Sequence, residues 1–232
     1  MANTDPIDLE GGGLLLVDKP VGWTSFDVVG KLRGALNSLA GRRVKVGHAG
    51  TLDPLASGLL LLAYGRRTKD LPNLTGLDKT YVGTLTLGEV TPSQDGETPV
   101  SASLPWAHLD RAAVEAVLPR FTGALLQRPP MYSAKHHKGE RAYFLARDGR
   151  SVEMEPVQVT VHALTLLDME GPRVTFATTV SKGTYIRTLA HDIGQALGCG
   201  AWLSALRRTR IAELDVADAL PPVELAQRIA PR

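Results

Sequence analysis

Short apolar runs alternate with amphipathic stretches along this chain. Apolar runs typical of buried strands occur at residues 14–17 and 59–63, and strand patterns recur at 81–87, 157–161, 165–168, 173–180 and 201–210. Helical periodicity predicts helices over 25–39, with Ser25 as N-cap, and over 109–118, 186–197 and 222–229. These elements follow no regular βαβ rhythm. We therefore expect an α+β fold with a mixed, mostly antiparallel central sheet flanked by helices.

The expected domain organisation is simple. Residues 1–12 are predicted to be a flexible N-terminus, and residues 13–232 a single catalytic domain with no separate C-terminal domain. The segment 127–155 stands apart, because it contains Pro129 and Pro130, many basic residues and a short helical run near 142–147. We interpret it as an insertion, with a long surface loop as the alternative.

Composition narrows the class of protein. A content of 44% hydrophobic and 22% charged residues is typical of a folded, soluble chain, and a net charge of +2 does not by itself indicate a nucleic-acid binder. Basic clusters at 42–45, 66–69, 135–141 and 207–210 would form a phosphate-binding surface if they converge, and are otherwise solvated loops.

Cys199 is the only cysteine, which excludes an internal disulfide and a multi-cysteine zinc site. The N-terminus has no signal-peptide pattern and no apolar run is long enough to span a bilayer, so we expect a cytoplasmic protein without a membrane partner.

The most informative string is GHAGTLDPLASG at residues 47–58. It places Asp53 on a glycine-bracketed turn between two apolar segments. A carboxylate held there by its flanking strands is well placed to act as a nucleophile or general base. Pro54 also restricts the backbone of Asp53 to extended conformations. From spacing alone, an ordinary turn with an Asx hydrogen bond is the alternative.

This string resembles the catalytic motif of the TruB family of tRNA pseudouridine synthases, in which the aspartate is catalytic. Further matches follow in the family's order: GLLLVDKP at 13–20, KTY at 79–81, PMYSA at 130–134, SKGTYIR at 181–187, and GCGA at 198–201 leading into LRR at 206–208. The resemblance covers residues 13–210, nearly the whole chain. It implies the same α+β architecture, with 127–155 as a thumb-like insertion that clamps RNA. It also implies a monomer without an obligatory protein partner.

The implied activity is the isomerisation of uridine to pseudouridine at position 55 in the T-arm loop of tRNA. The C1′–N1 bond breaks, the uracil turns, and C1′ joins C5, with only a proton exchanged. No metal and no redox cofactor are therefore expected. A uridine in folded RNA has to be flipped out to reach the carboxylate. Asp53 could attack the sugar, attack the ring or help to remove a ribose proton, and the sequence leaves these three courses open.

The resemblance also implies the residues around the substrate. Asp53 is the expected catalytic residue, and the expected substrate-binding residues are Lys19, His48, Lys69, Tyr81, Tyr185, Arg187 and Leu206. Tyr81 would stack on the uracil, although a cross-strand aromatic in a hairpin is the alternative. Arg187 would pair with Asp53 and keep it ionised, since a nearby cation favours a charged carboxylate.

Two departures from the family pattern bear on RNA binding. Bacterial members commonly carry a small RNA-binding domain after the catalytic one, whereas this sequence stops at Arg232, and the segment 89–96 is short for the family. A non-catalytic RNA chaperone that uses the same pocket is one alternative function. A nucleoside hydrolase is another, although no aspartate-rich cluster surrounds Asp53. Related synthases that work in guide-RNA complexes carry extensions that this sequence lacks.

Overall fold

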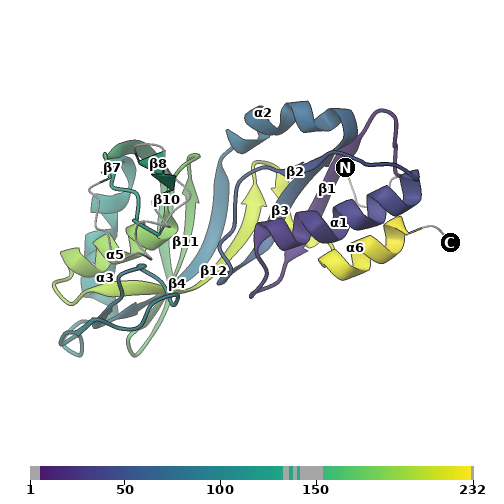
Figure 1. Ribbon diagram of the computed structural model, residues 1–232. Helices are drawn as coiled ribbons and strands as arrows, with labels where there is room; N and C mark the ends of the chain where they lie inside the picture. The colour runs from purple at the N-terminus through teal and green to yellow at the C-terminus, as the bar shows by residue number, and fades with distance from the viewer. Residues whose placement is uncertain (1–5, 133–135, 138–139, 142–153, 231–232) are drawn as a thin grey trace. The chain divides into compact units, whose positions relative to one another are not determined.

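The computed structural model describes residues 6–132, 136–137, 140–141 and 154–230 (Figure 1). The chain forms two compact units. The first contains Met1–Tyr81 and Leu206–Arg232, and the second contains Val82–Ala205. Strands β4 (Lys79–Leu87) and β12 (Ala201–Ile211) contribute residues to both units.

In the first unit the strand order is β1-β3-β12-β4. Strand β3 (Ala56–Tyr64) lies between β1 (Gly13–Lys19), with which it is antiparallel, and β12, with which it is parallel. Strand β2 (Val46–His48) also pairs with β3, and β13 (Leu214–Asp215) pairs with β12. The apolar run predicted at 59–63 is buried along its whole length. It forms a core with residues of β1 and β12 such as Leu16 and Ile211.

Helices α1 (Ser25–Ala40) and α6 (Pro222–Ile229) pack side by side in this unit (Figure 1). The predicted N-cap is wrong by one residue. Thr24 caps α1, because its hydroxyl accepts the backbone N–H of Asp27 while the Asp27 carboxylate accepts the N–H of Thr24. The sequence pattern did not predict η1 (Gly65–Asp70), α2 (Leu71–Thr75) or the short η3 (Val216–Asp218).

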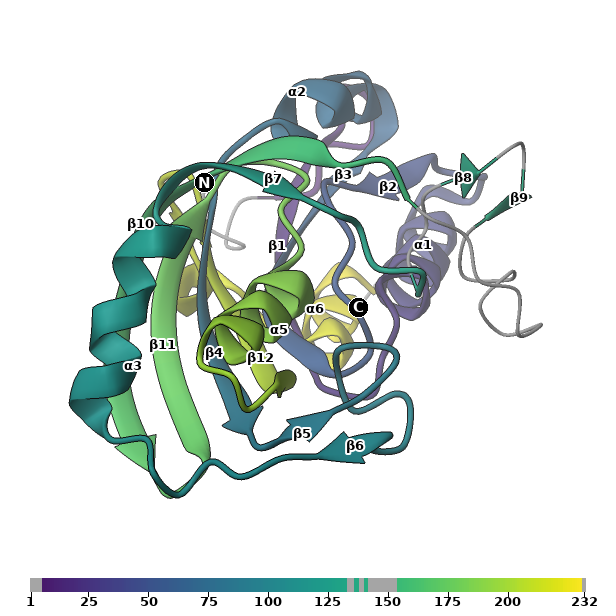
Figure 2. The same cartoon turned by 90° about the vertical axis from the view of Figure 1, so that its left-hand side faces the viewer.

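In the second unit the strand order is β12-β4-β11-β10-β7 (Figure 2). Strand β10 (Val157–Glu170) is antiparallel to both β11 (Arg173–Val180) and β7 (Gly123–Gln127). The predicted strands at 157–161 and 165–168 are therefore one strand. Two register shifts along β10, between Val161 and Ala163 and between Leu166 and Asp168, break its alternation and explain the error.

The helices of this unit are α3 (Arg111–Val117), which packs on β10, η2 (Leu118–Phe121) and α5 (Ile186–Ala196) (Figure 2). The described residues also form two small antiparallel strand pairs. Strand β5 (Glu89–Val90) pairs with β6 (Ala102–Ser103), and β8 (His136–His137) pairs with β9 (Glu140–Arg141). The expected α+β class with a mixed sheet is confirmed. The domain and insertion bounds remain predictions. The short helical run expected near 142–147, like most of the insertion, lies outside the described residues.

Candidate active site

Asp53 lies on a tight turn between β2 and β3 and is half-buried. Its carbonyl oxygen accepts the N–H of Ala56 at 3.0 Å, which closes the turn as β3 begins. The residues on both sides of Asp53 are also held. The Ser25 hydroxyl accepts the N–H of Leu52 at 2.9 Å and donates to its carbonyl at 3.0 Å. The carbonyl of Pro54 accepts the N–H of Gly22 at 2.8 Å. The backbone on either side of the carboxylate is thus fixed to the loop before α1 and to the first residue of that helix.

Gly58 allows the backbone of β12 to approach the motif closely. Gly58 has φ +101°, and a Cβ at this position would lie 2.2 Å from the carbonyl oxygen of Arg208 on β12. The side chain of Arg208 is itself buried, and it donates to the carbonyls of Leu59 at 2.6 Å and Gly50 at 3.1 Å. Arg208 therefore holds the backbone before and after Asp53 from inside the unit.

Lys19 supplies a buried positive charge close to this turn. Its side chain is 0% exposed, and its ammonium donates to the carbonyls of Pro20 at 2.9 Å and Trp23 at 2.6 Å. Burial lowers the pKa of Lys19 to about 8, while attraction to the Asp53 carboxylate works in the opposite direction. This attraction is mutual, so the Lys19 ammonium favours a charged Asp53.

Four further predicted residues belong to the same unit. His48 is half-buried on β2, and burial lowers its pKa, with the positive charge of Arg208 acting in the same direction. A neutral imidazole is therefore the expected form at neutral pH. Tyr81 is buried at the end of the part of β4 that belongs to this unit. Lys69 is exposed on η1, as a contact with an RNA backbone requires.

Leu206 is half-buried on β12 and lies opposite Ala56, the residue that closes the Asp53 turn. This register places an apolar residue of β12 beside the Asp53 turn. The first unit thus contains Asp53 with Lys19, His48, Lys69, Tyr81 and Leu206.

Tyr185 and Arg187 belong to the second unit, at the start of α5. The amide of Gln127, which is 3% exposed at the end of β7, holds the backbone of Tyr185 with two hydrogen bonds. Its Oε1 accepts the Tyr185 N–H at 2.7 Å, and its Nε2 donates to the Tyr185 carbonyl at 3.0 Å. Gln127 therefore fixes where the tyrosine side chain leaves the backbone.

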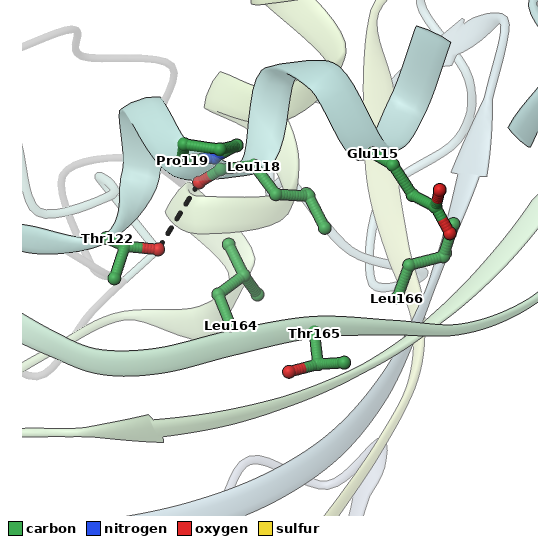
Figure 3. A pocket seen from close by; sticks show the side chains of 7 residues that line it. All are labelled: Glu115, Leu118, Pro119, Thr122, Leu164, Thr165 and Leu166. Atoms are coloured by element: carbon green, nitrogen blue, oxygen red, sulfur yellow. Dashed lines mark hydrogen bonds between the residues drawn. The ribbon is translucent and has the colours of Figure 1, made fainter. Parts of the chain in front are cut away.

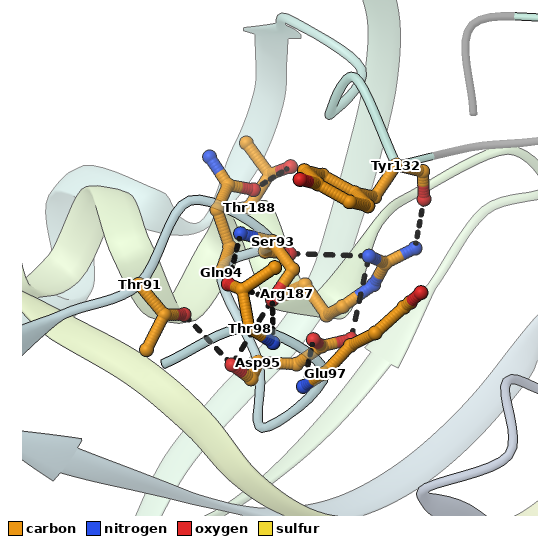
Figure 4. Close-up of polar contacts among 9 residues, drawn as sticks. All are labelled: Thr91, Ser93, Gln94, Asp95, Glu97, Thr98, Tyr132, Arg187 and Thr188. Atoms are coloured by element: carbon orange, nitrogen blue, oxygen red, sulfur yellow. Dashed lines mark hydrogen bonds and ion pairs between the residues drawn. The ribbon is translucent and has the colours of Figure 1, made fainter. Parts of the chain in front are cut away.

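Arg187 is buried and forms an ion pair with Asp95 (Figure 4). The distance from Arg187 Nη1 to Asp95 Oδ2 is 3.3 Å, and the two side chains are 5% and 2% exposed. Arg187 also donates to the carbonyls of Ser93 at 3.1 Å and Tyr132 at 2.9 Å. The guanidinium thus connects α5 to the segment 91–98 and to the start of the predicted insertion.

The segment 91–98 is itself tightly hydrogen-bonded (Figure 4). The hydroxyls of Thr91 and Ser93 both donate to the carbonyl of Asp95, at 2.7 and 3.1 Å. Gln94 has φ +63°, and its side-chain oxygen accepts the Thr188 hydroxyl at 2.9 Å. A non-glycine residue in this conformation is strained, and such strain is held where the surrounding contacts determine it. The short segment noted in the sequence therefore positions Asp95 against Arg187.

Sequence reasoning missed Asp95 and Gln127. Each contacts a predicted residue from a position far along the chain, 58 residues away for Gln127 and Tyr185. Asp95 lies in Ser-Gln-Asp-Gly, which reads as a surface turn. The pairing of Arg187 with Asp53 stays a prediction, since the two residues belong to different units.

The arginines of the basic cluster at 207–210 are buried or lie near carboxylates of the same unit. Arg207 makes a bidentate ion pair with Asp18, at 3.0 and 2.8 Å, and Arg208 is buried. Arg210 lies near Glu213 and Asp215. In the other described clusters, Arg42, Arg43, Lys45, Arg66 and Lys69 are exposed.

A surface hollow in the second unit lies between η2 and β10 (Figure 3). Its lining comprises Glu115, Leu118, Pro119, Thr122, Leu164, Thr165 and Leu166. The carboxylate of Glu115 already pairs with Arg111 at 2.8 Å. None of the predicted site residues lines this hollow, so it is not the candidate active site.

The described residues contain no group of three or more His, Cys, Asp or Glu side chains arranged to hold a metal ion. Within the same residues, no helix is both long and apolar enough to cross a membrane.

Comparison with known proteins identifies the family. The model of the TruB family pseudouridylate synthase N-terminal domain matches residues 38–186, and that of the tRNA pseudouridylate synthase B C-terminal domain matches 187–230. The chain belongs to the TruB family. It is thus a pseudouridine synthase, an isomerase. Among its TruB relatives, tRNA pseudouridine synthase B of Chlorobium luteolum is 47% identical over 221 residues, which cover 95% of this chain and 76% of that protein. The enzyme of the same name from Parabacteroides distasonis is 45% identical over 220 residues and covers 94% of each chain.

Solved structures show the same fold. A chain in a crystal structure of a Cbf5-Nop10-Gar1 complex superposes on this TruB protein with a TM-score of 0.68 and 31% identity, covering 91% of this chain and 52% of that one. A chain of the archaeal box H/ACA sRNP Nop10-Cbf5 complex gives a TM-score of 0.68 at 28% identity, covering 98% and 57%. The TruB chain thus spans little more than half of those chains.

Proposed function

We propose that this chain isomerises uridine to pseudouridine in tRNA, at position 55 of the T-arm loop, with Asp53 as the catalytic carboxylate. The observation that carries this proposal is the Asp53 turn. Its backbone is hydrogen-bonded on both sides of the carboxylate, and the buried Lys19 ammonium favours the charged form of Asp53. The names of the curated relatives support tRNA as the substrate.

The reaction conserves all atoms. The C1′–N1 bond breaks, the uracil turns, and a C1′–C5 bond forms; C5 then loses its proton and N1 gains one. Attack on the sugar, attack on the ring and removal of a ribose proton all begin from a charged carboxylate. A carboxylate that the fold holds in place spares the enzyme the rearrangement of its surroundings as charge changes in the reaction.

The other predicted residues receive roles around the flipped uridine. Tyr81 and Tyr185 contact the uracil, and Leu206 provides an apolar wall beside it. Arg187, which pairs with Asp95 in the second unit, is the proposed partner of the Asp53 carboxylate. Base flipping requires such stacking and edge contacts to replace those lost from the RNA.

The remaining residues bind the surrounding RNA. Neutral, half-buried His48 fills the space that the flipped base leaves in the loop, and exposed Lys69 contacts the phosphate backbone. Lys19 lines the pocket behind the tyrosine. The enzyme acts as a monomer without an obligatory protein partner.

The test maps the product at nucleotide resolution. The purified chain alone is incubated with an unmodified tRNA transcript, which is then treated with a carbodiimide that remains on pseudouridine after mild alkali. Primer extension should stop at one site, uridine 55, and a transcript with cytidine at that position should give no stop. Stops only at other uridines would overturn the assignment of position 55. RNA binding without any stop would favour the chaperone, and release of free uracil would favour the hydrolase.

A further inference from the structure

The loop after β1 and the first residues of α1, here residues 21–26, are fastened to both sides of the Asp53 turn. Gly22 donates to Pro54, and Ser25 exchanges two hydrogen bonds with Leu52. Any side chain presented by residues 21–26 is therefore held at a fixed position relative to Asp53. An RNA nucleotide that reaches Asp53 brings its neighbours close to this segment.

This segment exposes two large apolar side chains. Val21 is 64% exposed, and Phe26, in the first turn of α1, is 69% exposed. Helix α1 buries a different face, which includes Val28 and Leu32. The phenyl ring thus contributes little to the core, and its exposed apolar area costs free energy in water. Aromatic side chains are enriched in binding interfaces relative to the rest of a protein surface.

The surroundings of the ring favour RNA as the partner. The Arg33 guanidinium lies 5.8 Å from the centre of the Phe26 ring, so the platform includes a cation whose planar group can also stack on a base. Hydrogen bonds from the side chain and backbone of Thr24 lower the pKa of the neighbouring Asp27, which is therefore charged at neutral pH. This negative charge disfavours a phosphate directly beside the ring. The ring face is thus suited to a base rather than to the RNA backbone.

We propose that Val21, Phe26 and Arg33 form a stacking platform for an unpaired base of the substrate RNA that neighbours the target uridine. This inference rests on the proposed function. It adds a contact outside the predicted pocket, made by a base that is not itself isomerised.

The test uses Asp53→Asn as the background, so that the RNA is bound without turnover, and a T-arm stem-loop with 2-aminopurine beside the target uridine. Stacking on an aromatic side chain contributes about 1–3 kcal/mol per base, so Phe26→Ala should weaken RNA binding about fivefold or more. The quenching of 2-aminopurine should be reduced in parallel. Phe26→Tyr keeps the aromatic face and should restore both.

Val223→Ala is the matched control. Val223 is another exposed apolar residue of the same unit, 46% exposed on α6. The Val223→Ala variant should leave the Kd for RNA unchanged. Because Phe26 and Val223 are both exposed, neither alanine variant should lower the urea midpoint of unfolding. A Phe26→Ala variant whose Kd equals that of Val223→Ala would overturn the platform. A change in self-association without a change in Kd would overturn it too, and would identify this face as a protein contact.

The outcomes separate the two proposals. RNA binding that depends on Phe26, together with no pseudouridine from the native protein, would reject the proposed function and keep the platform. Pseudouridine formation by the native protein, together with an inert Phe26→Ala, would reject the platform alone.

Discussion

The buried ion pair between Arg187 and Asp95 leads to the sharpest stability prediction. Replacing Asp95 by asparagine removes the negative charge with almost no change in size. The side chains are 5% and 2% exposed, so water cannot solvate the guanidinium once its partner is neutral. Removal of one member of a buried pair typically costs about 3–5 kcal/mol. Arg187 keeps its two carbonyl acceptors, on Ser93 and Tyr132, so we expect the lower end, about 3 kcal/mol.

A loss of that size reduces the folding equilibrium constant about 100-fold. Urea unfolding followed by circular dichroism measures it as a lower midpoint at an unchanged m-value. The matched control is Glu170→Gln, which removes an exposed partner of Arg173, with side chains 61% and 77% exposed for arginine and glutamate. Exposed pairs contribute little, so this variant should differ from the native protein by less than about 1 kcal/mol.

Salt adds a second criterion. The loss in Asp95→Asn should persist at high ionic strength, because a buried pair is screened much less than an exposed one. If Asp95→Asn unfolds at the same urea concentration as Glu170→Gln, the charge of Asp95 does not stabilise Arg187 and the reasoning is refuted.

Three other predictions concern single positions. The pKa of Lys19 is lowered from 10.5 to about 8 in the folded protein. Below pH 8 the folded protein bears the full cost of burying a charged ammonium. Between pH 8 and 10.5 the folded protein gives up this proton more readily than the unfolded chain, so the cost disappears as pH rises. The unfolding free energy of the native protein should therefore gain about 3 kcal/mol relative to Lys19→Met across this window, and parallel pH profiles would contradict this. Gly58→Ala should lower the free energy of unfolding by at least about 2 kcal/mol in thermal unfolding, because the added Cβ would lie 2.2 Å from a backbone carbonyl oxygen. Gly30→Ala is the control and should not lower it, because the added Cβ lies in open space on α1. Gln127→Met removes two hydrogen bonds to the Tyr185 backbone and should slow single-turnover pseudouridine formation about tenfold without weakening RNA binding; equal rates would show that the tyrosine needs no such support.

The parts of the fold that depend on contiguous residues could be predicted. The buried strand at 59–63 follows from an unbroken apolar run, and α6 has the predicted bounds of 222–229. Strand β10 was divided wrongly because its two register shifts move side chains between the faces of the sheet, and such irregularities leave no simple pattern in the sequence.

The candidate site shows the same division. Asp53 could be identified because its motif is a single string, whereas Asp95 and Gln127 act through partners that only the fold brings near. The neighbouring residues Arg207 and Arg208 illustrate why. One pairs with Asp18 at the surface and the other is buried against backbone carbonyls, because successive residues of a strand point to opposite faces.

The most direct test of the central claim uses a T-arm stem-loop that carries tritium at C5 of the target uridine. Formation of the C1′–C5 bond releases this tritium into water, and the reaction is attributed to the Asp53 carboxylate. Native protein should release tritium, and Asp53→Asn should release none while still binding the RNA. If Asp53→Asn releases tritium at the native rate, or if the native protein binds full-length tRNA and releases none, the account is contradicted.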